Sequence, residues 1–253
     1  MNLLRDIKND KTGFGVLIAL GVVAIVIILL TPSIPQNQSY HQFSDTAVLF
    51  GIPNFWNVFS NLPFAIVGIL GLVNIKVISQ NKGVYRVFFY GVIFVSIGSG
   101  YYHIHPKDTT LIWDRLPMTI VFMSFVTIII TEFISVKIGR LILIPLLLLG
   151  VTSVLYWVAY GELKPYVFIQ FYPMLAIPVV LLFFKSNYNK VYAYWLLLLA
   201  YVMAKFLECF DYQMFEYLKI ISGHSLKHLI AAIGLFVLLY SYTKRENINK
   251  KTS

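Results

Sequence analysis

The sequence alternates between long apolar stretches and short polar connections from one end to the other. A helix needs roughly 17 to 25 mainly apolar residues to cross the ~30 Å hydrocarbon core of a bilayer. Eight stretches reach that length, at approximately residues 14–30, 57–78, 84–102, 111–134, 141–160, 166–184, 191–210 and 224–242. Apolar residues occupy every face of these stretches, whereas barrel strands would alternate with period two over about ten residues. The pattern therefore predicts an all-α integral membrane protein with eight transmembrane helices.

The composition agrees with this prediction and excludes several protein classes. Hydrophobic residues make up 58% of the chain and charged residues only 12%, about half the roughly 25% of an average globular protein. These figures exclude a soluble domain, an intrinsically disordered chain and a collagen-like repeat. The single cysteine, Cys209, also excludes a framework of internal disulfide bonds.

The formal net charge of +9 is, by itself, compatible with binding to an anionic partner such as nucleic acid. The distribution of the basic residues gives a different explanation. If the N-terminus is cytoplasmic, the inner segments hold 14 of the 20 basic residues: Arg5, Lys8, Lys11, Lys76, Lys82, Arg86, Lys137, Arg140, Lys185, Lys190, Lys244, Arg245, Lys250 and Lys251. This bias follows the positive-inside rule, which orients membrane proteins. We therefore expect a multi-pass protein of the cell membrane with both termini cytoplasmic, surrounded by the lipid bilayer and with no nucleic-acid partner.

The first apolar stretch, Phe14–Leu30, follows basic residues, as the hydrophobic region of a signal peptide does. It is long for such a region, and it ends in TPSIPQNQS, which contains no small-x-small cleavage site. We interpret it as an uncleaved transmembrane helix. The chain shows neither an internal repeat, which would mark a transporter built from two halves, nor a long linker between domains.

Five polar residues are predicted to lie at one membrane level, near the outer ends of three helices. Ser99 and His103 are four residues apart at the end of the third stretch, so they share a helix face. Asp114 lies near the start of the fourth stretch, and His224 and His228, again four apart, begin the last one. Ionisable groups inside a membrane are costly, so these residues predict a functional site toward the outer side.

Three imidazoles without a cysteine favour zinc, because catalytic zinc commonly has three protein ligands and an open fourth position. Each residue also has a simpler explanation. The HxxxH spacing arises by chance, and His103 beside two tyrosines suits an interfacial aromatic belt. Ser99 in GSG suits close helix packing, and Asp114 next to Arg115 suits a neutralised pair at a helix N-terminus. Their convergence on one level is what favours a joint site.

The order and spacing of these residues resemble a known family. Ser99-x-x-x-His103, then Asp114 eleven residues after the histidine, then His224-x-x-x-His228 at the start of the final stretch is similar to the pattern of the alkaline ceramidases. That family belongs to a superfamily of seven-span metal-dependent membrane hydrolases, which also includes the adiponectin-receptor-like proteins.

A second segment supports the resemblance. NFWNVFSNLPF, Asn54–Phe64, resembles the start of the first core helix of ceramidases, so the similarity extends from about residue 45 to about residue 242. The resemblance implies a seven-helix ceramidase-like bundle preceded by one extra N-terminal helix. The expected divisions are a cytoplasmic N-terminus with the extra helix at 1–35, an outer loop at 36–56, the core at 57–242 and a basic cytoplasmic tail at 243–253.

The resemblance also implies an activity and the roles of the residues. The expected protein is a zinc-dependent amidase that cleaves the N-acyl bond of ceramide-like lipids into a fatty acid and a sphingoid base. By similarity, His103, His224 and His228 bind zinc, Asp114 acts on the metal-bound water, and Ser99 lies beside the metal. At that position the Ser99 hydroxyl is able to donate a hydrogen bond to the developing oxyanion.

One segment departs from the family pattern. Animal alkaline ceramidases have an acidic calcium-binding segment before the first core helix, whereas here only Asp45 offers a carboxylate, and Asn54 stands where a Glu is usual. Calcium prefers several carboxylate or carbonyl oxygens. We therefore do not expect calcium regulation, and we expect these two residues to order the outer loop by hydrogen bonds.

Three more ionisable residues lie near the outer end of the seventh stretch: Lys205, Glu208 and Asp211. Pairing of Lys205 with Glu208 at i,i+3 is one explanation, and orientation of a zinc-binding histidine is another. Two other functions stay open, namely a hydrolase of another acyl lipid and a receptor or transporter that uses the polar cluster for ligand binding. The sequence leaves the oligomeric state open.

Overall fold

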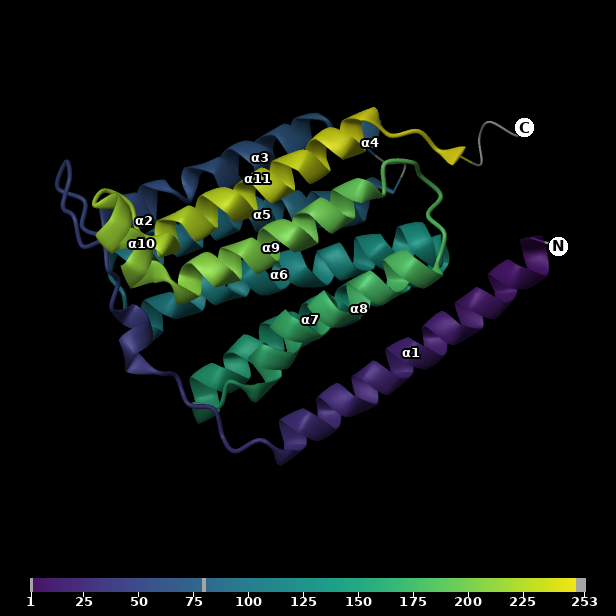
Figure 1. The fold of residues 1–253 in the computed structure, drawn as a ribbon, viewed down its shortest axis with the longest axis horizontal. Helices are drawn as coiled ribbons and strands as arrows, with labels where there is room; N and C mark the ends of the chain where they lie inside the picture. The colour runs from purple at the N-terminus through teal and green to yellow at the C-terminus, as the bar shows by residue number, and fades with distance from the viewer. Residues whose placement is uncertain (1, 79–80, 249–253) are drawn as a thin grey trace. The chain divides into compact units, whose positions relative to one another are not determined.

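The computed structural model describes residues 2–78 and 81–248, and its elements there are helices (Figure 1). Eight helical stretches within these residues are long and apolar enough to cross a membrane. The predicted fold class, an all-helical multi-pass membrane protein, is confirmed. Lys250 and Lys251, counted above among the inner basic residues, lie outside the described residues with the end of the predicted tail.

The helix bounds agree with the predicted stretches to within a few residues at most ends. In chain order the elements are α1 (Asn2–Leu30), η1 (Gln38–His41, a short 3-10 helix), α2 (Phe55–Phe59), α3 (Leu62–Val73), α4 (Ile75–Ile78), α5 (Lys82–Ile104), α6 (Asp108–Phe133), α7 (Val136–Tyr160), α8 (Lys164–Phe183), α9 (Tyr192–Cys209), α10 (Asp211–Leu218) and α11 (Gly223–Lys244).

The second apolar stretch is present but divided. Its residues form α2, α3 and α4, and the first break falls at Ser60 and Asn61. Pro63 follows in the first turn of α3, where the N–H that proline lacks has no partner within the helix anyway. The break turns polar groups of residues 57–61 toward the interior, since Asn57, Ser60 and Asn61 are all buried.

The helices form two compact units, of which the first comprises residues 36–121 and 192–244. In this unit α11 packs against α9 and α3, and α3 packs against α5. Figure 1 shows α3, α11 and α9 running alongside one another, with α2 and α10 at the same end. A Cβ atom at Gly98 would overlap the carbonyl of Trp113, and one at Gly223 would overlap the carbonyl of Leu207. Glycine at these two positions therefore permits backbone contact between α5 and α6 and between α11 and α9.

The second unit comprises residues 1–35, 122–191 and 245–253. Within its described part α1 and α7 both pack against α8. The hydroxyl of Tyr172 on α8 donates to the carbonyl of Leu17 on α1, at 3.2 Å. Many apolar side chains of α1 remain exposed, Leu29 at 73% for example, as expected for a helix that faces lipid.

Two polar interactions hold loops of this second unit. The Glu162 carboxylate accepts the backbone N–H groups of Ile34 and Lys164, each at 3.0 Å. These bonds, that from Ile34 first, lower the pKa of the Glu162 carboxyl below its usual 4.5. Arg245 forms a buried ion pair with Glu132 at 2.7 Å, which ties the segment after α11 to the end of α6.

Candidate metal centre

Three imidazoles meet inside the first unit. His103 comes from the end of α5, and His224 and His228 come from the first two turns of α11. Their ring centroids are 4.9 to 5.1 Å apart, and one potential ligand atom from each ring lies within 4.8 Å of the others. All three side chains are buried. Three nitrogen donors at this separation are able to hold one metal ion.

The hydrogen bonds of the three rings support a ligand site. Nδ1 of His103 and Nε2 of His224 are buried and have no hydrogen-bond partner among the described residues. Buried polar atoms are nearly always paired, so two unpartnered imidazole nitrogens in one cluster indicate a group that binds there. Nδ1 of His228 is 2.9 Å from Oγ of Ser60, which fixes this ring and leaves its Nε2 for a ligand.

Ser60 occupies this position because of the break between α2 and α3. Its hydroxyl also lies 3.2 Å from the carbonyl of Asn57, and the side-chain nitrogen of Asn61 is 3.4 Å from Nδ1 of His228. Asn57 in turn accepts a hydrogen bond from the hydroxyl of Ser225 on α11, at 2.7 Å. No spacing pattern in the sequence marks Ser60 as a site residue, although it lies inside the segment NFWNVFSNLPF that carries part of the family resemblance.

Asp114 and Ser99 are brought together beside the close approach of α5 and α6. The side chain of Ser99 hydrogen-bonds with the carboxylate of Asp114, and both residues are buried. Ser99 precedes His103 by one turn of α5, so this pair and the imidazoles extend from neighbouring turns of the same helix. All five predicted site residues therefore belong to the first unit and come from the three predicted helices.

The start of α11 is held by two side chains. Oδ1 of Asp211 accepts the backbone N–H of His224 at 2.6 Å, and Oγ of Ser222 accepts that of Ser225 at 3.4 Å. Both bonds satisfy N–H groups that have no partner within the helix. Asp211 thus fixes the backbone of a candidate ligand. Its other oxygen accepts the N–H of Ser44, at 3.1 Å.

A segment before α2 lies over the imidazoles; we call it the cap and define it as Gln36–Asp45. Its residue Phe43 is buried, with its ring centroid 4.7 Å from that of His103 and 4.8 Å from that of His224. An apolar ring against two candidate ligands excludes water from that side of the cluster. No pattern in the sequence marks Phe43, because a single aromatic residue in a loop has no periodic partner.

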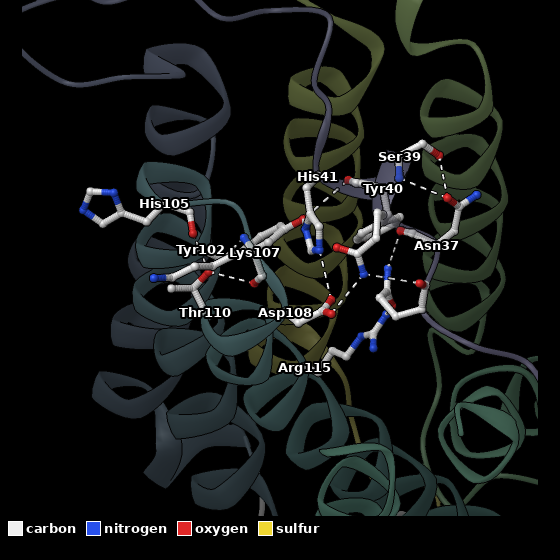
Figure 2. A network of polar contacts seen from close by, with 12 residues as sticks. Asn37, Ser39, Tyr40, His41, Tyr102, His105, Lys107, Asp108, Thr110 and Arg115 are labelled. Carbon is white, nitrogen blue, oxygen red and sulfur yellow. Dashed lines mark hydrogen bonds and ion pairs between the residues drawn. The ribbon is translucent and has the colours of Figure 1, made fainter. Parts of the chain in front are cut away.

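Figure 2 shows the polar contacts that fix the cap. His41 bridges two helices, with Nδ1 2.9 Å from the hydroxyl of Tyr102 on α5 and Nε2 3.0 Å from Oδ1 of Asp108 on α6. Arg115 on α6 donates to the side-chain oxygen of Gln36 at 2.6 Å. The cap is therefore attached at both ends and in the middle.

Asp45 and Asn54 have different environments. Oδ1 of Asp45 accepts the N–H of Ala47 at 3.0 Å, while its Oδ2 is buried without a hydrogen-bond partner among the described residues. Burial, and to a smaller extent the nearby Asp211 carboxylate, raises the pKa of Asp45 above its usual 3.8. Asn54 donates from its side chain to the carbonyl of His103 at 2.8 Å, so it supports a candidate ligand directly.

One carboxylate at the end of α9 binds two lysines. Glu208 pairs with Lys205 at 2.8 Å through Oε2, as expected from the i,i+3 spacing. Its Oε1 contacts the ammonium of Lys227 on α11, a partner that the sequence did not reveal. The hydroxyl of Tyr40 in the cap lies within electrostatic range of Lys205 and Glu208. Although the residue as a whole is 37% exposed, its hydroxyl end is enclosed, and this desolvation, aided by the Glu208 charge, raises the pKa of Tyr40.

Comparison with known proteins relates this site to a family. A family model described as ceramidase matches residues 44–252, most of the chain, and the matched region contains all three histidines together with Ser99 and Asp114. The match begins after α1, so that helix precedes the family region. No curated protein matches the chain.

Proposed function

The chain belongs to the ceramidase family, and from that premise we propose that it is a zinc-dependent amidase embedded in the membrane. Its reaction is hydrolysis of the N-acyl bond of ceramide-like lipids, which releases a fatty acid and an amine such as a sphingoid base. The observation that carries the proposal is the buried cluster of His103, His224 and His228. Family membership supports a hydrolase that acts on amide bonds.

The donor set fits zinc. Three neutral imidazoles are a known ligand set for catalytic zinc, and no cysteine is present at the cluster. Two of the three rings have a buried nitrogen that no described residue contacts by a hydrogen bond, and the third is oriented by Ser60. When bound there, the metal supplies Lewis acidity, which activates water and polarises an amide carbonyl.

The protein's own residues supply the proton transfers. In this proposal the Asp114 carboxylate accepts a proton from the attacking water and delivers it to the leaving amine. Ser99 holds that carboxylate through its hydroxyl. The Ser99 hydroxyl has one proton, and it is engaged in the hydrogen bond to Asp114. To stabilise a developing oxyanion, Ser99 would first have to break that bond. We therefore assign Ser99 first to orienting Asp114 and second to the oxyanion.

The surroundings suit a lipid substrate. The cluster lies among helices whose outward surfaces carry exposed apolar residues, such as Phe94 and Ile97 on α5 and Val202 on α9. A lipid is able to enter such a site from the bilayer and leave its chains between helices, while its amide meets the polar cluster. By the loop charges, the site faces the outer side of the cell membrane.

Hydrolysis of an N-acyl sphingoid lipid by purified protein in detergent tests the proposal. We expect fatty-acid release by the wild-type chain. Asp114→Asn should retain its metal and lower kcat by a factor on the order of 10² to 10⁴, the usual contribution of general acid–base catalysis. His105→Ala is the matched control, because His105 is exposed two residues after His103.

The outcomes separate the alternatives. If the protein hydrolyses ester lipids but no amide lipid, it is a lipid hydrolase and not an amidase. Full activity of the Asp114→Asn variant would show that Asp114 does not carry the proton. Specific lipid binding without any hydrolysis would favour a receptor or transporter.

A further inference from the structure

The first unit has an open groove at the end opposite the three histidines. The groove lies between α11 and the pair α3 and α4, and its volume is about 360 Å³, within the range of small-molecule sites. Figure 1 shows α4 beside the end of α11, away from α2 and α10. Lys244, at the groove, lies 16 residues after His228 on α11, roughly 24 Å at a rise of 1.5 Å per residue. The groove is therefore separate from the candidate metal centre.

Most of the groove is apolar. Leu239 on α11 is buried at its base, and Phe236 and Tyr240 of the same helix are exposed beside it. These three residues share one helix face because they are three or four positions apart. Leu70 on α3 and Val77 on α4, both exposed, form the facing wall. In a membrane such a surface meets hydrocarbon, so the groove is suited to an acyl chain.

The polar lining residues lie together at one end of the groove. Asn74 follows the last residue of α3, and Thr243 and Lys244 end α11. The side-chain nitrogen of Asn74 donates to the carbonyl of Leu70 at 2.8 Å, and the Thr243 hydroxyl donates to the carbonyl of Tyr240 at 2.9 Å. The exposed ammonium of Lys244 is thus the charged donor at this end. Both walls change from apolar to polar in the same direction, as a phospholipid does from chain to headgroup.

Basic residues of the first unit collect at this same end. Lys76 lies on α4, Lys82 and Arg86 lie in the first two turns of α5, and Lys244 ends α11. The acidic residues of the unit belong to the histidine end, in the cap, near the start of α6, at the end of α9 and on α10: Asp45, Asp108, Asp114, Glu208, Asp211 and Glu216. The end with the groove therefore has a positive potential.

The acidic residues that adjoin this end do not cancel its charge. Glu132 forms an ion pair with Arg245, so neither residue enters the balance. Glu246 follows Lys244 by two residues and contributes a single negative charge against those of Lys76, Lys82, Arg86 and Lys244.

The lysines at the two ends of the unit also differ in their partners. Lys219, exposed at the histidine end, pairs with Glu216 at 2.9 Å. Within the part of the chain that the structure describes, Lys76 and Lys244 form no ion pair. Basic pockets between transmembrane helices on the cytoplasmic side bind phosphate-containing lipid headgroups. An apolar groove with Lys244 at its mouth has this chemistry.

We propose that the groove binds an anionic phospholipid of the cytoplasmic leaflet, with an acyl chain over Leu239 and the phosphate at Lys244. The leaflet follows from the predicted orientation, which places this end of the helices inside. The phospholipid is a bound ligand and not the substrate, whose amide belongs with the histidines. The inference goes beyond the proposed amidase activity and does not depend on it.

Two phospholipids with the same acyl chains test the groove. Dioleoyl phosphatidylglycerol is anionic and dioleoyl phosphatidylcholine has no net charge, and each is titrated into delipidated, zinc-loaded, full-length protein in a neutral detergent. The rise in Tm with lipid concentration gives an apparent Kd. We expect tighter binding of phosphatidylglycerol. Lys244→Gln should weaken that binding about fivefold, the effect of one lysine beside an anionic lipid, and should leave phosphatidylcholine unaffected.

Matched variants separate the groove from general attraction to a charged surface. Lys137→Gln removes an exposed lysine at the start of α7, outside the groove, and should bind both lipids as the wild type does. Lys244→Arg keeps the charge and should keep the preference for phosphatidylglycerol. Leu70→Trp fills the apolar part and should weaken binding of both lipids, whereas Ile69→Trp, at an exposed position outside the groove, should not. The Tm of each tryptophan variant without lipid reports whether it folds.

The outcomes decide the proposal. Equal binding of the two phospholipids, unaltered by Lys244→Gln, overturns it. Equal losses in Lys244→Gln and Lys137→Gln show attraction to the whole basic surface and overturn the groove as the site. Displacement of phosphatidylglycerol by glycerol phosphate, which has no acyl chain, shows a site for free phosphate and overturns the lipid assignment. Hydrolysis enters none of these measurements, so their failure leaves the amidase intact, and an inactive protein that passes them retains the groove.

Discussion

At the scale of single residues, the site depends on hydrogen bonds that orient the imidazoles. Ser60 contacts Nδ1 of His228, Asp211 holds the backbone of His224, and Asn54 holds that of His103. Each candidate ligand thus has a fixed neighbour. Partners of this kind set the tautomer and the direction of a ligand ring, and they contribute to metal affinity.

The Ser60 contact gives a quantitative prediction. Ser60→Ala should weaken zinc binding by roughly 10- to 100-fold, because the ring of His228 loses the bond that orients it. Competition with a chromophoric chelator measures the change. Ser153→Ala is the control, since Ser153 is equally buried but its hydroxyl donates to the carbonyl of Gly150 within its own helix, α7. Equal affinities in the two variants would show that Ser60 does not act on the metal site.

At the scale of elements, the apolar stretches predict the spans because helix length is dictated by bilayer thickness. Ser99, His103, Asp114, His224 and His228 were predicted from spacing within helices and from the order of helix ends. The break at Ser60 was not, since Asn57–Ile78 is apolar enough to appear continuous.

Contacts between different helices could not be predicted from the sequence either. Glu208 has one lysine in its own helix and a second on α11, and only the first follows from spacing. The position of Phe43 depends on the path of the cap, which hydrogen bonds to α5, α6 and α10 determine. The periodicity of a single helix does not predict contacts between residues that are far apart in the sequence.

The cap supplies a prediction about pH. Because burial and Asp211 raise the pKa of Asp45, the protonated form is favoured in the folded cap. This contribution to stability is fully present below the usual value of 3.8 and is lost as pH rises through the folded pKa. Asp45→Asn keeps an acceptor for Ala47 without the charge, so it should raise Tm at neutral pH and flatten the pH profile of Tm.

Thermal unfolding between pH 4 and pH 8 measures this effect, with Asp10→Asn on α1 as the control in the other unit. A lower Tm for Asp45→Asn would contradict the prediction. If added calcium then stabilised only the wild-type protein, the carboxylate would be a cation ligand, against our expectation for this segment.

At the scale of the whole molecule, eight candidate spans and a family region that begins after α1 describe a multi-pass membrane protein with one helix added before the ceramidase region. The side of the membrane on which the site lies is a prediction from the loop charges. The basic residues at inner connections predict that the histidine cluster faces outward, where lipid of the outer leaflet is accessible.

Labelling of engineered cysteines tests this orientation. In a Cys209→Ser background, Lys107→Cys should react with a membrane-impermeant maleimide in intact cells, since Lys107 is exposed in the connection between α5 and α6. Lys137→Cys, exposed at the start of α7, should react only after permeabilisation. The reverse pattern would place the site on the cytoplasmic side.

The central claim is that the three buried histidines bind a catalytic zinc ion, and metal analysis tests it most directly. Purified, folded full-length protein should contain about one zinc ion per chain, as a three-histidine site requires. The double variant His224→Ala, His228→Ala should lose this zinc, and His105→Ala should keep it. A well-folded wild-type protein without zinc, which takes up none from buffer, would contradict the mechanism.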